Sequence, residues 1–190
     1  MSVVNPNIRF TYEDYKSLPE SMEKRYELLD GDLLMVPAPT TYHQFVSRNL
    51  EFILHSFART HGLGNVLYAP VDVVLGTGKD REVVQPDVLF ISRGRTAIIA
   101  PAEIQGAPDL IVEVLSPGTE ERDRGYKRHL YGRYGVLEYW IVDPEAETID
   151  VIRAAGAEFE LAMTCGVNQT LSSSIFPGLE IDLHEVFRVR

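Results

Sequence analysis

The chain has 190 residues, 45% of them hydrophobic, and a formal net charge of −10 at pH 7. This length and hydrophobic content suit one domain over residues 1–190 with a substantial core, and they exclude a disordered chain. The acidic balance excludes a protein that wraps nucleic acid non-specifically, so any contact with DNA would need a local basic patch.

The chain lacks the features of an exported or disulfide-bonded protein. Cys165 is its single cysteine, which excludes an internal disulfide and a cysteine-based zinc site. The start Met-Ser-Val-Val-Asn-Pro has neither the basic nor the apolar region of a signal peptide. No apolar run is long enough to span a membrane. We therefore expect a cytoplasmic protein without membrane contact.

The first third of the chain predicts a short helix, a hairpin and a long helix. Thr11 is a suitable cap for a helix over residues 12–18. Residues 25–36 hold an Asp-Gly pair between two apolar runs, the strongest hairpin signal in the sequence. Apolar residues recur with helical period over 41–61, and Gly62 is a suitable stop for that helix.

The remaining two thirds predict mainly strands. Residues 66–75 and 83–91 are expected to form two strands joined by a polar turn, and the apolar run 110–115 is typical of a strand covered on both faces. A loose surface loop, a helix and four further strands are expected at residues 93–107, 119–134, 137–142, 148–153, 159–163 and 179–183. This order predicts an α/β fold with a mixed central sheet, helices on both faces and an N-terminal β-hairpin.

Two acids, Asp87 and Glu113, lie inside apolar, β-branched strands. A carboxylate in such a run is costly unless it is paired, protonated or bound to a metal. Strand period would let them cluster on one face together with Asp72, provided that neighbouring strands pair in a suitable register. Two carboxylates and a substrate phosphate suffice for Mg²⁺ or Mn²⁺, and a backbone carbonyl near Leu115 could add a ligand. The pair therefore suggests a divalent-metal site for phosphodiester chemistry.

A cation follows the two acids. Lys127 lies within residues 122–133, the most basic stretch of the chain and the candidate contact for DNA. Its ammonium could stabilise charge on the phosphate during hydrolysis.

Structural alternatives stand beside these assignments. Lys127 could form a helical ion pair with Asp123 at i,i+4. Asp87 could cap backbone groups at the end of a strand, since it follows a proline. Glu113 could pair with one of the helix arginines.

Several motifs occur together and in a fixed order. They are Tyr26-Glu-Leu-Leu-Asp-Gly31, Pro37-Ala-Pro39 with His43-Gln44, Gln85-Pro-Asp87, Pro108-Asp-Leu-Ile-Val-Glu-Val-Leu-Ser-Pro117, Arg122-Asp-Arg-Gly-Tyr-Lys127 and Gly135-Val-Leu-Glu-Tyr-Trp-Ile-Val-Asp-Pro144. This set, spanning about residues 10 to 187, closely resembles the Uma-two family of restriction-type endonucleases in the PD-(D/E)XK nuclease superfamily.

The resemblance implies a restriction-endonuclease-like core, Mg²⁺- or Mn²⁺-dependent hydrolysis of DNA, and a homodimer. Asp87 and Glu113 would be the metal ligands. Leu115 stands two residues after Glu113 where the superfamily motif has lysine, and the resemblance suggests that Lys127 takes over that role.

The resemblance also places Glu27 and His43 at the border of the catalytic site. The alternative for Glu27 is the solvent face of the hairpin, and for His43 a polar residue at a helix start. For the chain as a whole, the alternative function is a non-catalytic nuclease-like module that binds nucleic acid or a partner protein. A nuclease for RNA or for branched DNA is a third possibility.

Overall fold

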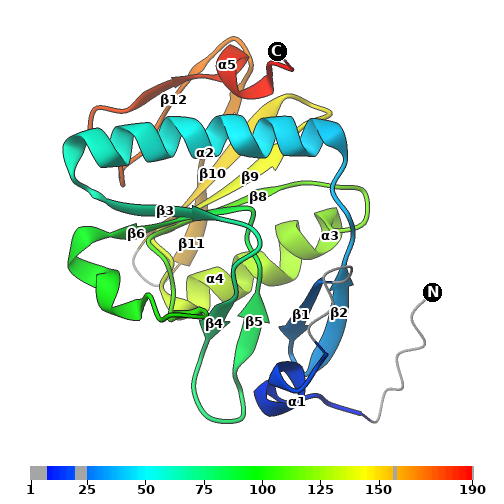
Figure 1. Ribbon diagram of the computed structural model, residues 1–190. Helices are drawn as coiled ribbons and strands as arrows, with labels where there is room; N and C mark the ends of the chain where they lie inside the picture. Colours follow the sequence, from blue (N-terminus) through cyan, green and yellow to red (C-terminus); the bar gives the residue numbers. More distant parts are fainter. Residues whose placement is uncertain (1–7, 20–24, 156–157, 190) are drawn as a thin grey trace.

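The computed structural model describes residues 8–19, 25–155 and 158–189 (Figure 1). The N-terminal residues expected to carry no signal peptide lie outside the described part. The helices are α1 Tyr12–Lys16, α2 Thr41–His61, the 3₁₀ helix η1 Arg93–Ile98, α3 Glu120–Arg122, the π-helical turn η2 Asp123–Lys127, α4 Arg128–Tyr134 and α5 Leu183–Phe187. The strands are β1 Arg25–Leu29, β2 Asp32–Val36, β3 Gly64–Tyr68, β4 Val73–Leu75, β5 Glu82–Val84, β6 Val88–Ser92, β7 Ile104–Gln105, β8 Leu110–Val114, β9 Glu138–Asp143, β10 Thr148–Ala155, β11 Glu158–Gly166, β12 Thr170–Ser172 and β13 Glu180–Asp182.

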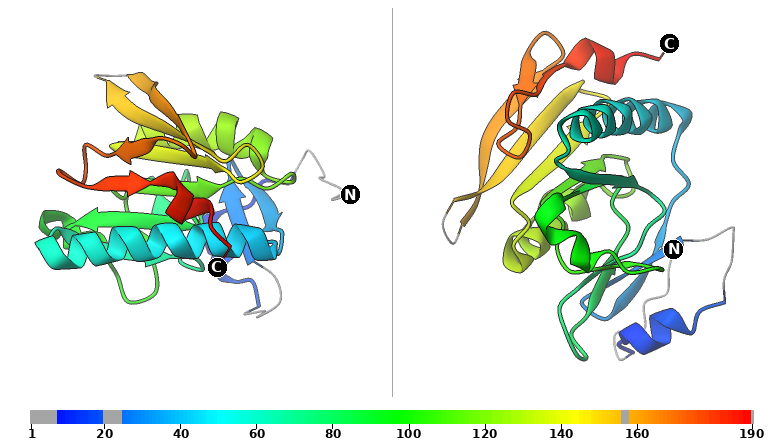
Figure 2. Two further views of the ribbon diagram at one scale, coloured as in Figure 1. Left: turned by 90° about the horizontal axis from the view of Figure 1, so that it is seen from above. Right: turned by 60° about the vertical axis from the view of Figure 1, so that its left-hand side comes forward.

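A six-stranded mixed sheet of order β11-β10-β9-β8-β6-β3 forms the centre of the molecule. Its strands β8 and β9 are parallel and joined through α3, η2 and α4, whereas the other neighbours are antiparallel. Helix α2 covers one face of this sheet, and the α3–α4 segment covers the other (Figures 1 and 2). The predicted mixed α/β fold with helices on both faces is therefore confirmed.

Strand β8 divides the core into two layers by the alternation of its side chains. Leu110, Val112 and Val114 pack in the layer that contains the buried face of α2, with Val46, Leu50 and Leu54 among its members. Ile111 and Leu115 pack in the opposite layer, against α4. Because successive strand residues point to opposite faces, Glu113 belongs to the α4 side.

The elements at the start of the chain agree with their sequence signals. Thr11 caps α1 through its side chain, and Gly62 ends α2 in the left-handed conformation. Asp30 and Gly31 both have positive φ, as a two-residue turn between β1 and β2 requires. Among the described residues, no helix is both long and apolar enough to cross a bilayer.

The two long strands predicted at 66–75 and 83–91 are each divided in two. Their outer halves, β3 and β6, pair in the central sheet, whereas β4 and β5 join a second sheet of order β2-β1-β5-β4-β7. Pro70 and Pro86 lie at the two breaks, where the missing N–H group cannot continue a ladder. The hairpin β1–β2 is thereby attached to the central sheet.

The segment 93–107 is more ordered than the expected loose loop. It contains η1 and the short strand β7. The Arg95 guanidinium donates to Asp109 Oδ1 at 2.9 Å and to the Ala107 carbonyl at 2.7 Å. These contacts between residues 12 to 14 positions apart hold the segment against the start of β8, and no local sequence pattern predicts them. Strand β12 was also not predicted.

Candidate active site

The pairing of β6 with β8 brings Asp87 and Glu113 together. Val88 pairs with Val112 at the end of this ladder, so extending the register by one residue sets Asp87 opposite Glu113. The carboxylate of Asp87 accepts the N–H of Val114 through Oδ2 at 2.8 Å. Asp87 therefore caps a backbone N–H group at the end of a strand, which was the structural alternative for this residue, and it also lies beside Glu113.

All five candidate residues line one small pocket of about 40 Å³. The pocket lies where β6 begins and β8 ends, and it is closed by the hairpin, the start of α2 and the helical turn η2. Its charged and polar side chains are Arg25, Glu27, His43, Gln85, Asp87, Glu113, Ser116, Thr119, Arg122, Asp123 and Lys127. Asp72 is not among the lining residues, because the break at Pro70 carries β4 into the second sheet. It accepts from Tyr15 and Gln85 instead.

Lys127 lies at the centre of a buried cluster of carboxylates. Its Nζ is 2.8 Å from Glu27 Oε1, 2.9 Å from Glu113 Oε1 and 3.3 Å from Asp123 Oδ1. The lysine side chain is only 3% exposed. Burial lowers the pKa of Lys127, but the three carboxylates outweigh burial and hold the pKa well above its usual value. The ammonium is therefore charged and neutralises part of the cluster.

The turn η2 places Asp123 and Lys127 inward together. Its π-helical geometry widens one turn within a longer helix, a feature that recurs at functional sites. The i,i+4 pair with Asp123 is thus present, but as part of the buried pocket and not on a solvated helix. Asp123 lines the same pocket, whereas the sequence indicated it only as an ion-pair partner of Lys127. The available signal was its position four residues before Lys127.

Glu113 is held on its other side by a tyrosine. The Tyr131 hydroxyl donates to Glu113 Oε1 at 2.7 Å. Burial, opposed by Lys127 and reinforced by the carboxylates of Asp123 and Asp87, raises the pKa of Glu113 to about 8. Glu113 therefore holds a proton near neutral pH. Its expected alternative partner, a helix arginine, is replaced by Lys127.

Glu27 lies inside the fold and not on the solvent face of the hairpin. It is 1% exposed, and its Oε1 accepts the N–H of Gln85 at 3.0 Å. Its Oε2 lies 3.5 Å from Arg122. Burial raises the pKa of Glu27, but Lys127 and the Gln85 N–H more than offset burial, so the pKa lies below its usual value. Glu27 is therefore a buried, charged part of the pocket.

His43, in the first turn of α2, reaches the end of β8 from the opposite layer. Its Nε2–H donates to the Val114 carbonyl at 2.9 Å, and the same nitrogen is 3.3 Å from Asp87 Oδ2. Burial lowers the pKa of His43, but Asp87 and the carbonyl outweigh this effect and raise it above the ordinary value. His43 and the Val114 N–H together fix the Asp87 carboxylate.

The basic stretch 122–133 presents less free charge than its sequence indicates. Arg122 contacts Glu27, Arg124 contacts Asp143 and Asp150, and Arg133 contacts Glu82. These ion pairs neutralise most of the helix within the fold. The stretch 122–133 therefore offers an anionic ligand less unpaired positive charge than its sequence predicts.

The donors that face the pocket fit a hard cation. Among the described side chains that line the pocket, three buried oxygens, Glu27 Oε2, Gln85 Oε1 and Asp123 Oδ1, accept no hydrogen bond, although Arg122 lies 3.5 Å from the first and Lys127 lies 3.3 Å from the last. Hard cations such as Mg²⁺ select oxygen ligands and keep several waters. Within the described ranges, no three or more histidine, cysteine or acidic side chains converge in an arrangement that could enclose a metal ion. A site here would rest on Asp87, Glu113, water and substrate.

The comparisons with known proteins agree with this fold. The chain is similar to a solved structure from Anabaena variabilis ATCC 29413, described as "a putative nuclease belonging to DUF820". The TM-score is 0.77 and the sequence identity is 20%, and the match covers 94% of this chain and 97% of that chain. A curated relative, the "Uncharacterized protein slr1290" of Synechocystis sp. (strain ATCC 27184 / PCC 6803 / Kazusa), is 27% identical over 149 residues, which are 77% of this chain and 75% of the relative.

The family comparison covers nearly the same span as the ordered motifs. The family model Uma2, described as "Putative restriction endonuclease", matches residues 12–184. This span includes Glu27, His43, Asp87, Glu113 and Lys127. The family match supports assignment of the chain to the nucleases. The chain belongs to the Uma2 family.

Proposed function

We propose that this protein is a metal-dependent endonuclease that hydrolyses phosphodiester bonds in DNA. The observation that carries the proposal is the convergence of Asp87, Glu113 and Lys127 in one pocket, from the residue before β6, from β8 and from the turn η2. Membership of the Uma2 family supports the same reaction class.

Asp87 and Glu113 are the residues that would hold Mg²⁺ or Mn²⁺. When bound, such a cation lowers the pKa of a water and neutralises charge that develops on the phosphate. The Asp87 carboxylate is held in a fixed orientation for this role, because His43 and the Val114 N–H both contact its Oδ2. Glu113 is oriented by the hydroxyl of Tyr131 and by Lys127.

Lys127 supplies positive charge beside Glu113 without leaving its buried position. In the protein alone its ammonium contacts Glu27, Glu113 and Asp123. During hydrolysis the same ammonium stabilises the negative charge of the phosphoryl oxygens, because a fixed cation in a dry pocket needs little reorganisation. Glu27 and Asp123 act as positioning residues that hold the lysine in place.

Plasmid cleavage tests the proposal. Purified protein is incubated with supercoiled plasmid and Mg²⁺ or Mn²⁺, together with the variants Asp87→Asn and Glu113→Gln. The matched control is Asp109→Asn, which alters a buried carboxylate just before β8 that pairs with Arg95 outside the pocket. We expect cleavage by the wild type and the control, and at least a 100-fold loss in both site variants. Equal cleavage by all four proteins would defeat the assignment.

A non-catalytic nuclease-like module is the second candidate. The observation in its favour is that Lys127 already forms an ion pair with Glu113, one of the two carboxylates that would bind the metal. Calorimetric titration with Mg²⁺ and Mn²⁺ separates the two candidates. Heat of binding that disappears in Glu113→Gln supports the nuclease, whereas no metal binding together with retained nucleic-acid binding supports the module.

We also propose that the chain works as a homodimer, because a double-strand cut by one site per subunit needs two copies related by two-fold symmetry. Light scattering coupled to gel filtration should then report about twice the monomer mass of 21.4 kDa. A mass that stays at the monomer value at working concentrations contradicts the dimer.

A further inference from the structure

Among the residues that the structure describes, most cations without an ion pair lie beside helix α2 and strand β3. Ten lysines and arginines in the described ranges form salt bridges with carboxylates. The described cations outside these pairs are Arg25, Arg48, Arg59, Lys79, Arg93 and Arg128. Four of these six, Arg25, Arg48, Arg59 and Arg93, line two adjoining surface grooves beside α2 and β3. On a chain of net charge −10 this grouping marks a local surface suited to an anionic polymer.

The helix side of this surface is a stripe on α2. Arg48, His55 and Arg59 are spaced at i, i+7 and i+11, so they share one face of the helix. At about 1.5 Å of rise per residue, Arg48 and Arg59 are separated by about 16 Å along the axis. The stripe also contains one acid, Glu51, which lies 3.8 Å from His55. Its arginines thus remain the dominant charges.

The surface leads directly to the candidate active site. Helix α2 and strand β3 are consecutive and antiparallel, so the start of α2 and the end of β3 lie at the same side of the sheet (Figure 1). The groove at that end, of about 980 Å³, is lined by Arg48 and Tyr68 and shares Arg25, Pro39 and Asp87 with the catalytic pocket. The second groove, of about 520 Å³, continues to Arg59 and Arg93. We define the two grooves together as the α2–β3 track.

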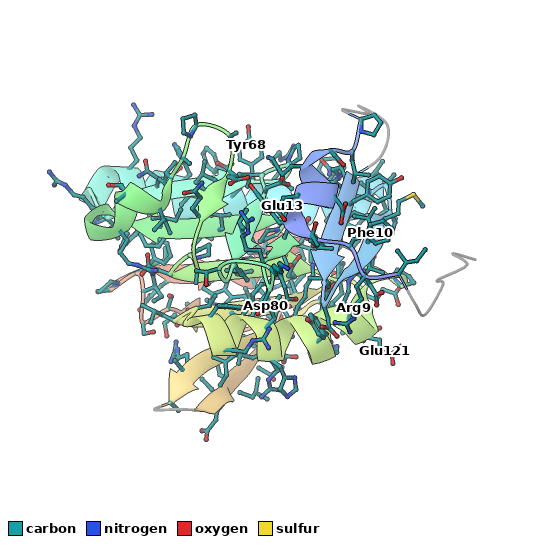
Figure 3. The ribbon with its side chains drawn as sticks, turned by 90° about the horizontal axis from the view of Figure 1, so that it is seen from below. Arg9, Phe10, Glu13, Tyr68, Asp80 and Glu121 are labelled. Atoms are coloured by element: carbon teal, nitrogen blue, oxygen red, sulfur yellow. The ribbon has the colours of Figure 1, made fainter. Side chains whose placement is uncertain are left out.

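An exposed aromatic ring stands where the track meets the active site. Tyr68, the last residue of β3, is 62% exposed and lies at the outer edge of the molecule (Figure 3). A single exposed tyrosine is ordinary on a protein surface. This one lines the same groove as Arg48, whose guanidinium lies 5.0 Å from the Phe45 ring. Aromatic rings interleaved with arginines form stacking platforms for unpaired bases, which a duplex keeps inside its own stack.

We propose that the α2–β3 track binds single-stranded nucleic acid and feeds it to the catalytic pocket. An unpaired base stacks on Tyr68, and the phosphates that follow contact Arg48, Arg59 and Arg93. That the bound strand is then cleaved rests on the proposed nuclease function, but binding by the track is measured independently of cleavage. The assigned substrate is DNA whose strands are unpaired next to the scissile phosphates, as in a locally opened stretch of a supercoiled plasmid, so that each subunit of the proposed dimer cuts one opened strand.

Binding is measured by fluorescence anisotropy in EDTA, with a labelled 12-nucleotide oligo-dT strand and a 12-base-pair duplex as probes. The test variants are the double substitution Arg48→Gln/Arg59→Gln and the pair Tyr68→Ala and Tyr68→Phe. The matched control, Lys79→Gln/Arg128→Gln, removes two cations without ion pairs that lie outside the track. All variants carry a check of folding by thermal melting.

We expect the wild type to bind the single strand at least tenfold more tightly than the duplex. The double arginine variant should bind the strand at least tenfold more weakly, and its slope of log affinity against log salt should fall by about 1.4, which is about 0.7 for each lost phosphate contact. Tyr68→Ala should weaken binding about 5- to 150-fold, corresponding to one stacked base, and Tyr68→Phe should retain it because the ring remains. The control should stay within twofold.

Two outcomes overturn the inference: tighter binding of the duplex, or equal losses in the control and in the track variant. Its failure is distinguishable from failure of the nuclease. If Asp87→Asn abolishes plasmid cleavage while the track variants bind like the wild type, only the track is wrong. If no cleavage occurs but the track variants lose single-strand binding, the track stands and the nuclease fails.

Discussion

Replacement of Lys127 by methionine tests whether the buried cation holds the pocket together. The substitution keeps a chain of similar length but removes the charge that lies within 3.3 Å of Glu27, Glu113 and Asp123. Breaking a buried ion pair by removing one partner costs about 3–5 kcal/mol, because the remaining charge stays desolvated. Since a domain has about 5–15 kcal/mol of stability in total, Lys127→Met should fold but be marginal.

The stability that Lys127→Met loses should depend on pH, and the pKa values of the neighbouring carboxyl groups determine whether this loss grows or shrinks as the pH rises. In the native wild type the pKa of Glu113 is about 8, raised above its unfolded value near 4.3. Between these two values the native state binds the additional proton, so the contribution of Glu113 to stability declines as the pH rises. Without Lys127, burial raises the pKa of Glu113 further and also raises the pKa of Glu27, which Lys127 holds below its usual value in the wild type. Between pH 5 and pH 8 the native variant then keeps a proton on Glu27 that the unfolded chain releases, so the variant loses stability at this residue as the pH rises and the wild type does not. The deficit of Lys127→Met should therefore be larger at pH 8 than at pH 5.

Urea denaturation at pH 5 and pH 8, followed by far-ultraviolet circular dichroism, measures the free energy of unfolding. A loss of about 3–5 kcal/mol at pH 8 corresponds to a fall in Tm of roughly 6–20 °C for a chain of this size. The control Lys79→Met, in the exposed turn between β4 and β5, should stay within about 0.5 kcal/mol. The double variant Lys127→Met/Glu113→Gln should recover part of the loss. A deficit below about 1 kcal/mol, or one that is equal at both pH values, refutes the reasoning.

Three further expectations concern the neighbours of the pocket and the distant core. Tyr131→Phe removes the hydroxyl that donates to Glu113 and should lower stability by about 1–2 kcal/mol in urea denaturation; no loss would mean that the bond contributes nothing. Because the pKa of Glu113 is about 8, Mn²⁺ must displace its proton at neutral pH. The affinity for Mn²⁺ measured by calorimetry should therefore rise about tenfold for each pH unit between pH 6 and 8. An affinity that does not change with pH would remove Glu113 from the metal site. Glu138 is fully buried and accepts hydrogen bonds from Trp140, Ser173 and Arg153. Glu138→Gln should lower stability by about 3 kcal/mol and alter tryptophan fluorescence, while the folded fraction keeps Asp87-dependent cleavage. An unchanged Tm would contradict this expectation.

Local signals in the sequence were sufficient for most helices and strands. The capping residue Thr11, the Asp-Gly turn of the hairpin and the stop at Gly62 each act through the backbone of a few neighbouring residues, so they operate wherever the rest of the chain lies. The same local reasoning failed at Pro70 and Pro86. A proline shows that a ladder is interrupted, but it does not show that the two halves of a strand then enter different sheets.

By itself, the sequence determined that Asp87 and Glu113 are acids next to or within apolar strands and need a partner, and that Lys127 is the nearest candidate cation. Which partners they meet was decided only by the tertiary structure. The register of β6 against β8 sets Asp87 opposite Glu113, and the turn η2 directs Lys127 to Glu113 and Glu27. Register and helix orientation depend on packing between residues distant in the chain, whereas sequence patterns report mainly on neighbours. For the same reason, only the fold distinguishes Arg122, Arg124 and Arg133, which form ion pairs, from Arg48 and Arg59 of α2, which form none with the described residues.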